Sequence, residues 1–215
     1  MRNKGNTKIN KIIEVAERLP VFTLDNLASV EADRKYLRIL LSRRVKSGNI
    51  IRLKKGMYVG RDYLDRVEKA GRMRVYAEFV AGILYKPSYL SLEYVLHQHG
   101  MITELPATVT IVTRKKTTTF KTPFGVYQYH SIKPLLFTGF LSKRDGDYLI
   151  FRASLAKALF DFLYFRKNYL TNKEAVSELR LNLEILSKED KKELARYVDL
   201  EGTPQMKNIL IMLFK

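Results

Sequence analysis

The chain has 215 residues, enough for one large domain or two small ones, and it carries a formal charge of +17. It contains no cysteine, which excludes disulfides, thiolate metal ligands and cysteine nucleophiles. The longest apolar runs, 79–85 and 209–214, are far shorter than the roughly 20 residues of a membrane helix. Residues 1–4 are polar with no apolar stretch behind them, so we expect no signal peptide and a cytoplasmic protein.

The positive charge is concentrated near the N-terminus. Residues 1–60 hold 14 basic and 5 acidic side chains, a net charge of +9, whereas the other 155 residues hold 25 and 17, a net charge of +8. A concentrated positive field indicates a polyanionic partner. Nucleic acid is a commoner partner than a membrane surface for a chain with a compact globular pattern.

Residues 1–60 show three helical patterns in succession. Apolar spacing, capping residues and breakers predict helices over residues 8–18, closed by Pro20; 24–29, capped by Thr23; and 33–47, ended by Gly48. Two strands, 49–53 and 57–59, follow as a hairpin with a glycine in its turn. Three helices and a basic hairpin are the order of a winged helix-turn-helix, whose last helix enters the DNA major groove.

The third helix and the hairpin carry the candidate DNA-binding residues. A polar stripe at helical spacing consists of Lys35, Arg38, Ser42 and Lys46, with Arg34 and Arg43 beside it. We expect the stripe to contact bases, and the hairpin residues Arg52, Lys54 and Lys55 to contact phosphates or the minor groove. The alternative is the solvated face of an ordinary helix. That alternative explains neither the hairpin nor the concentration of charge.

The rest of the chain predicts a mixture of helices and strands. Residues 61–70 are a candidate linker within a mostly helical segment, 62–84, and a helix opens at Pro87-Ser88 and stops at His99-Gly100. A strand is expected at 107–113, a strand pair at 117–120 and 126–130, and a turn at 145–147. Further helices are expected at 155–166, 172–186, 188–198 and 204–214. The fold class is therefore α+β, with a winged helix-turn-helix domain at 1–60 and a mixed α/β domain at 61–215 whose C-terminal part is helical.

The sequence offers little for catalysis. His97 and His99 are two residues apart and do not share a helix face. No phosphate-binding glycine loop, nucleophile elbow or convincing carboxylate pair is present. Asp161 lies in a very apolar helix, where we expect it to pair with a buried cation, Arg152 or Lys157, rather than to catalyse. We therefore expect no enzyme, no cofactor and no metal site.

Three stretches resemble the AbiEi-type antitoxins of bacterial abortive-infection and type IV toxin–antitoxin systems. Residues 41–59 are similar to that family's recognition helix and wing, ending in Gly56-Met57-Tyr58. Residues 87–102, with the strand 109–113, are similar to the opening of its second domain, and 156–166 to its Lys-Ala-Leu-x-Asp helix. The likeness runs in order from about residue 20 to 166, and the last fifty or so residues match no pattern of the family.

The resemblance implies an antitoxin used in phage defence. Its winged helix would repress its own operon by binding promoter DNA, and its second domain would counter a nucleotidyltransferase-type toxin, directly or functionally. Arg114, Lys115 and Lys116, beside the strand 109–113, are then candidates for partner or further DNA contact. A solvated strand end is an equal alternative for these three residues.

Two other functions remain open from the sequence. One is a stand-alone transcriptional regulator whose C-terminal domain senses a small ligand or mediates oligomerisation. The other is a nucleic-acid-processing enzyme that uses the winged helix to deliver its substrate, which the missing catalytic pattern disfavours. A neighbouring toxin gene distinguishes the antitoxin from the regulator.

Overall fold

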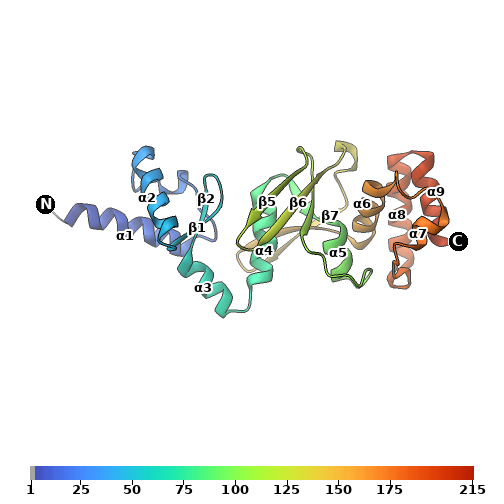
Figure 1. The fold of residues 1–215 in the computed structure, drawn as a ribbon, viewed down its shortest axis with the longest axis horizontal. Helices are drawn as coiled ribbons and strands as arrows, with labels where there is room; N and C mark the ends of the chain where they lie inside the picture. Colours follow the sequence, from blue (N-terminus) through green and yellow to red (C-terminus); the bar gives the residue numbers. More distant parts are fainter. Residues whose placement is uncertain (1–2) are drawn as a thin grey trace. The chain divides into compact units, whose positions relative to one another are not determined.

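The computed structural model describes residues 3–215, with side chains from residue 9 onward. Met1 and Arg2, part of the polar N-terminus considered above, lie outside the described residues. The chain divides into two compact units (Figure 1). Unit 1 comprises the residues up to 77 together with 122–124, and unit 2 comprises 78–121 and 125–215. Unit 1 thus continues past the boundary that we predicted after residue 60.

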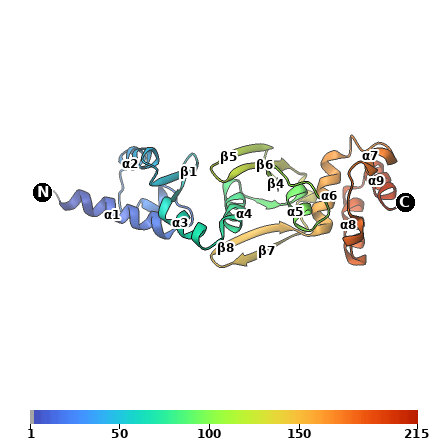
Figure 2. The same cartoon turned by 60° about the horizontal axis from the view of Figure 1, so that its bottom comes forward.

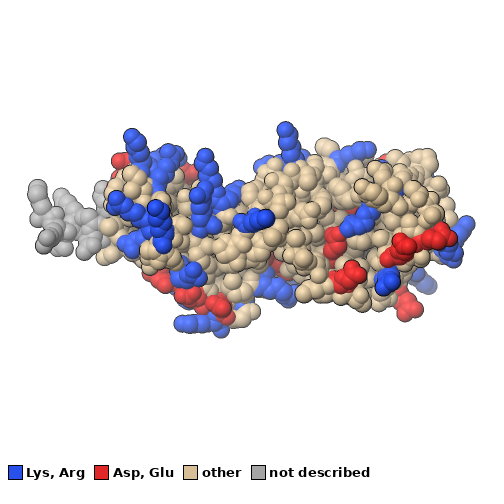
Figure 3. All heavy atoms as spheres, in the orientation of Figure 1, with Lys and Arg blue, Asp and Glu red and all other residues tan. Residues whose placement is uncertain are grey.

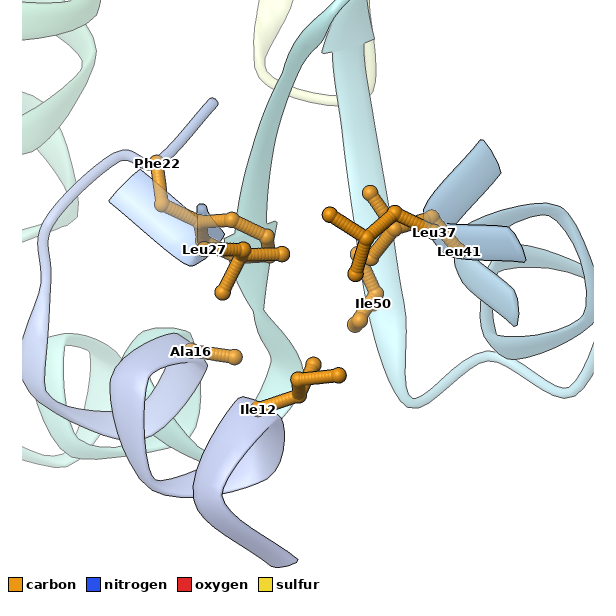
Figure 4. Close-up of a cluster of buried hydrophobic side chains, with 7 residues drawn as sticks. All are labelled: Ile12, Ala16, Phe22, Leu27, Leu37, Leu41 and Ile50. Atoms are coloured by element: carbon orange, nitrogen blue, oxygen red, sulfur yellow. The ribbon is translucent and has the colours of Figure 1, made fainter. Parts of the chain in front are cut away.

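Unit 1 consists of helices followed by a two-stranded hairpin. Its elements are α1 (Asn3–Arg18), the short 3₁₀ helix η1 (Asp25–Leu27), α2 (Arg34–Lys46), β1 (Ile50–Lys54), β2 (Met57–Gly60), α3 (Arg61–Lys69) and the start of α4 (Met73–Leu84). Six side chains from these elements, with Phe22 from the connection between α1 and η1, converge in a buried core (Figure 4): Ile12, Ala16, Phe22, Leu27, Leu37, Leu41 and Ile50. This is the element order that the sequence predicts for a winged helix-turn-helix.

Two expectations for unit 1 need correction. The predicted helix at 24–29 is only the three residues of η1 flanked by turns, and its backbone hydrogen bonds, such as Ala28 N to Asp25 O at 3.2 Å, span three residues rather than four. Asn26 Oδ1 accepts hydrogen bonds from the amide and the hydroxyl of Thr23 at 2.8 and 3.1 Å, at the start of this turn. The candidate linker at 61–70 is the helix α3, whose buried Leu64 and Val67 pack it into unit 1 beside α1 and β2.

Unit 2 is built on a six-stranded mixed sheet. Its strands are β3 (Ser88–Leu90), β4 (Val109–Thr113), β5 (Thr118–Thr122), β6 (Gly125–Ser131), β7 (Phe140–Asp145) and β8 (Tyr148–Ala153), in the order β5-β6-β4-β3-β8-β7. β3 pairs antiparallel with β4 and parallel with β8, β4 pairs parallel with β6, and β7 pairs antiparallel with β8. β3 is therefore central in the sheet.

Helices cover both faces of this sheet (Figure 2). The hydroxyl of Tyr129 donates to Ala81 O in α4, whereas Thr110 Oγ1 accepts from Tyr94 N in α5 (Leu92–Gln98). Ile111 is the register partner of Tyr129 and follows Thr110 on β4, so α4 and α5 lie on opposite faces. α6 (Leu155–Arg166) packs against α5 and against two C-terminal helices, α8 (Lys188–Glu201) and α9 (Pro204–Phe214). The short helix α7 (Lys173–Ser177) packs against α9.

Two expectations for unit 2 are wrong. The helix that we predicted from Pro87-Ser88 begins only at Leu92, because residues 88–90 form β3. All three β3 residues are buried between two neighbouring strands, so the segment shows no alternation of apolar and polar residues. The strands predicted at 107–113, 117–120 and 126–130 agree with β4, β5 and β6, the 145–147 turn joins β7 to β8, and the fold class is α+β. The helix predicted at 172–186 is much shorter: α7 ends at Ser177, Arg180 takes a left-handed φ of +47°, and residues 183–185 form the 3₁₀ helix η3. Within the described residues, no helix is both long and apolar enough to cross a membrane.

Candidate nucleic-acid interface

The helix α2 is fixed at both ends and along its buried side. Asp33 caps the N-terminus, since its Oδ1 accepts hydrogen bonds from the amides of Lys35 and Tyr36 at 2.8 and 3.1 Å. Gly48, at φ +77°, takes the left-handed conformation that lets the chain leave the helix. Leu37 and Leu41 are buried in the core of unit 1 and set the rotation of α2 about its axis. The opposite side of α2 consequently faces solvent.

All the α2 residues proposed from the sequence lie on that exposed side: Arg34, Lys35, Arg38, Ser42, Arg43 and Lys46. Figure 3 shows basic side chains gathered over the part of unit 1 where Figure 1 places α2 and the hairpin. Arg34 forms an exposed ion pair with Asp25 of η1, so its guanidinium already has a partner. An exposed pair of this kind contributes little to stability.

The hairpin formed by β1 and β2 is the wing. Its turn is Lys55-Gly56, and Gly56 has a φ of +79°, a conformation that suits glycine. A bulge interrupts the pairing between Arg52 and Lys54. Arg52 and Lys55 are exposed, while Lys54 is half-buried. The predicted turn and its two lysines are thus present at the tip of the hairpin.

A hollow of about 520 Å³ separates α2 from the wing within unit 1, which we call the wing hollow. Its lining consists of Leu24, Arg38, Ser42, Val45, Lys46, Arg52, Lys55, Gly56 and Tyr58. The structure therefore brings together five of the nine proposed residues: Arg38, Ser42, Lys46, Arg52 and Lys55. Arg34, Lys35, Arg43 and Lys54 lie outside this lining. Four cations and no carboxylate line the hollow, which suits an anionic ligand.

Phe22 and Gly60, which the sequence did not indicate, hold the wing in place. Phe22 pairs with Tyr58 of β2 through backbone hydrogen bonds of 2.8 and 2.9 Å, and their rings stack with centroids 5.8 Å apart. At Gly60, a Cβ atom would lie 2.4 Å from the backbone oxygen of Ala16 in α1. An isolated aromatic in a predicted loop was the only signal for Phe22 in the sequence.

The exposed side of α2 also carries two large hydrophobic side chains that the sequence did not indicate, Tyr36 and Ile39. Tyr36 is 39% exposed and Ile39 is 53% exposed. Neither belongs to the core of unit 1 or to the side chains packed against it. They are part of the same surface as the basic residues of α2.

Arg114, Lys115 and Lys116, proposed as partner contacts in unit 2, are exposed directly after β4. The guanidinium of Arg114 lies 5.4 Å from the centre of the Phe137 ring, and Lys115 Nζ lies 5.0 Å from the centre of the Tyr85 ring. Cations at such distances are attracted to aromatic faces. Their role as partner contacts stays a prediction.

Of the two cations predicted as partners of Asp161, Lys157 is the one that pairs with it. The two side chains are fully buried, with Lys157 Nζ 2.7 Å from Asp161 Oδ1, and the hydroxyls of Tyr89 and Ser91 donate to Asp161 Oδ2 at 3.0 and 2.7 Å. Burial raises the pKa of the Asp161 carboxyl, and the neighbouring Lys157 opposes that rise. The other candidate, Arg152, pairs with Glu78 instead. Because the pair has no access to solvent, its role is structural.

Metal-binding groups are not brought together in the described residues: no cluster of three or more histidine or acidic side chains could hold an ion. This includes His97 and His99, which lie at the end of α5. The chemistry that the described surfaces support best is the binding of an anionic polymer by α2 and the wing.

No curated protein sequence gave a significant match to the chain. Among protein families, residues 10–59 match the one described as "Transcriptional regulator, AbiEi antitoxin". The matched segment runs from α1 to β2, and it contains both α2 and the wing. Over residues 10–59, the predicted resemblance to the AbiEi antitoxin family of transcriptional regulators is therefore confirmed.

Proposed function

We propose that this protein binds double-stranded DNA through α2 and the wing, and that it represses its own operon in the cytoplasm as an antitoxin. The observation that carries the proposal is the wing hollow, where four cations and no carboxylate lie between a solvent-facing helix and a basic hairpin. The match of this segment to a family of transcriptional regulators supports it.

The dimensions of α2 suit the major groove. Its 13 residues give a rod about 20 Å long at about 1.5 Å per residue, and the groove of B-DNA, about 12 Å wide, admits one helix. In this arrangement Lys35, Arg38, Ser42 and Lys46 meet base edges. The remaining proposed residues contact the sugar–phosphate backbone: Arg34, Arg43, Arg52, Lys54 and Lys55. Base contacts specify the operator, and phosphate contacts supply affinity that falls with salt.

The first experiment measures binding of the full-length protein to the DNA upstream of its own gene over a salt titration. A scrambled duplex of equal length is the control. Preference for the native sequence, with a salt slope that reports several phosphate contacts, is the expected result. Equal, steeply salt-dependent binding to both duplexes would contradict a specific operator and leave only a nonspecific basic surface.

The proposal assigns neutralisation of a nucleotidyltransferase-type toxin to unit 2. The antitoxin description of the matched family and the separate core of unit 2 support this division. Co-expression with the toxin gene beside the antitoxin gene should restore growth, and a pull-down then shows whether the toxin is bound directly. Failure of the full-length protein to restore growth would contradict the antitoxin role while leaving repression intact.

One observation favours a second candidate, a regulator whose unit 2 senses a small ligand. A hollow of about 290 Å³ in unit 2 is lined by Leu92, Glu93, Pro106, Ala107, Thr108, Thr110, Gln128, His130, Phe165 and Arg166. Glu93 and Arg166 form an ion pair in it, and burial lowers the pKa of His130. A gene neighbourhood without a toxin, together with a metabolite that changes DNA affinity, would favour this candidate over the antitoxin.

We also propose that the protein is not an enzyme. The one fully buried ion pair among the described ionisable side chains, Lys157 with Asp161, is enclosed by its hydrogen-bond partners and has no solvent-accessible surface. Incubation of the pure protein with DNA and RNA, with and without divalent metal ions, tests this. Metal-dependent cleavage would overturn it.

A further inference from the structure

Ile39 is an aliphatic side chain that lies outside the core of unit 1. Among the apolar residues of α2, Leu37 and Leu41 are buried in the core, and Leu40 and Val45 pack against it. Ile39 does neither, and 53% of its surface is exposed. A β-branched residue is also a weaker helix former than the lysines and arginines around it. Neither packing nor helix propensity therefore accounts for an isoleucine at this position.

The position of Ile39 is the middle of the exposed face of α2. It follows Lys35 by four residues and precedes Ser42 by three and Lys46 by seven. At 3.6 residues per turn these intervals place the four residues on one face. Leu37 and Leu41 point to the opposite side, into the core. Ile39 thus lies within the set of polar residues that we assign to base edges.

Charge decides what can cover this apolar spot. The α2 sequence contains six basic residues and no acidic one, so two copies of this face would repel each other. The same charges attract the DNA duplex. In the major groove of DNA, the C5 methyl of thymine is the apolar group that a side chain can contact.

We propose that Ile39 packs against the C5 methyl of a thymine and makes α2 discriminate T·A from C·G at that base pair. The inference rests on the proposed DNA-binding function and adds a specificity determinant to it. Arg38, Ser42 and Lys46 then supply hydrogen bonds and charge around an apolar contact that they cannot make themselves. Replacing the methyl by hydrogen removes about one buried methyl group, which weakens binding about fourfold.

The test exchanges thymine for uracil, which keeps base pairing and lacks only the methyl group. The full-length protein selects its preferred duplex from a random pool, so the natural promoter need not be known. Each thymine of that duplex is then replaced in turn, and binding is measured for the wild type and for Ile39→Ala. Ile211→Ala is the matched control, because Ile211 in α9 is a similarly exposed isoleucine, at 47%.

The wild type and Ile211→Ala should lose about fourfold in affinity at one thymine, and Ile39→Ala should show no loss there. Ile39→Val keeps both γ carbons and loses only the δ carbon, so it should retain part of the sensitivity. Circular dichroism checks that each variant is folded.

Two results would overturn the inference: a thymine-to-uracil loss that is equal in Ile39→Ala and in the wild type, or no thymine whose methyl matters. A pool that yields no enriched sequence would instead refute the proposed sequence-specific DNA binding. The two failures are therefore distinguishable.

Discussion

At the scale of single residues, Lys157 and Asp161 show how much unit 2 depends on one buried ion pair. They lie one helical turn apart in α6, and both are fully buried. Lys157 Nζ also donates to Leu136 O at 2.8 Å and lies 4.6 and 5.2 Å from the ring centres of Phe160 and Tyr197. Each charge is thus compensated within the fold, and the loss of either partner leaves the other uncompensated.

Lys157→Met should strongly destabilise the protein, because it leaves the Asp161 carboxylate buried without its cation. A decrease of about 3–5 kcal/mol in the free energy of unfolding is expected when one partner of a buried pair is removed. Urea denaturation followed by circular dichroism measures it.

The matched control is Lys207→Met. Lys207 forms an exposed pair with Asp199, with an N–O distance of 3.8 Å, and its removal should cost under about 1 kcal/mol. Similar small effects of both substitutions would show that the buried pair does not stabilise the fold.

Gly60 and Gly82 allow a comparison between a glycine with no room for a side chain and a glycine with room for one. A Cβ at Gly60 would meet the backbone of Ala16 at 2.4 Å, whereas a Cβ at Gly82, within α4, would meet nothing within 4 Å apart from its chain neighbours and the nearby backbone of its own helix. Gly60→Ala should therefore lower the free energy of unfolding by about 1–3 kcal/mol, as overpacking does. Gly82→Ala should raise it by about 0.5–1 kcal/mol, because alanine is the better helix former.

Urea denaturation of the two glycine variants and the wild type, side by side, gives the sign of each effect. A stable Gly60→Ala protein would mean that α1 and the start of α3 can separate at little cost. That result would weaken the view that Gly60 fixes the base of the wing against α1.

At the scale of elements, the wing is the part of the interface whose contribution can be isolated. Replacing both Lys54 and Lys55 by alanine should weaken binding to every DNA sequence. The slope of log affinity against log salt should become less steep by about one unit for each lost phosphate contact. Binding of the double variant and the wild type to native and scrambled duplexes over a salt titration measures this.

The charge-matched control for the wing is the double substitution Lys191→Ala and Lys192→Ala in α8. These are also adjacent, exposed lysines, but they belong to unit 2. The control should keep the wild-type slope. If the wing variant also keeps it, the wing is not part of the DNA interface.

The elements that could be predicted from the sequence are those whose signals are local. α2 was predicted because an apolar stripe and Gly48 agree, and the wing because basic residues and Gly56 follow it. The strand β3 could not be predicted, because a central strand buried on both faces has no alternation of apolar and polar residues. The short 3₁₀ form of η1 could not be predicted either, because apolar residues three or four positions apart are typical of both helix types.

The candidate interface was predictable in part for the same reason. Charge can be seen directly in a sequence, so the basic residues of α2 and the wing could be predicted from it. The support from Phe22 and the exposure of Ile39 depend on tertiary packing. The wing hollow itself exists only once the hairpin has folded back toward α2.

At the scale of the whole molecule, the candidate DNA-binding surface belongs to unit 1, and the domain proposed to counter the toxin is unit 2. Residues 1–60, which carry net charge +9, lie in unit 1 together with the wing hollow. Unit 2 has its own sheet, its own buried ion pair and its own polar hollow. A chain divided in this way can lose the surface of one unit while the core of the other stays intact.

The division predicts that repression and neutralisation can be uncoupled. Replacing Arg38 and Lys46 by alanine removes two cations from the wing hollow, and each should cost about 1–3 kcal/mol in DNA binding if it contacts a base. Both side chains are exposed, so the fold should be retained. A promoter–reporter fusion should then be derepressed, while co-expressed toxin should still be countered. If the variant loses toxin rescue as well as repression at equal protein level, neutralisation depends on DNA binding, and unit 2 is not an independent antitoxin.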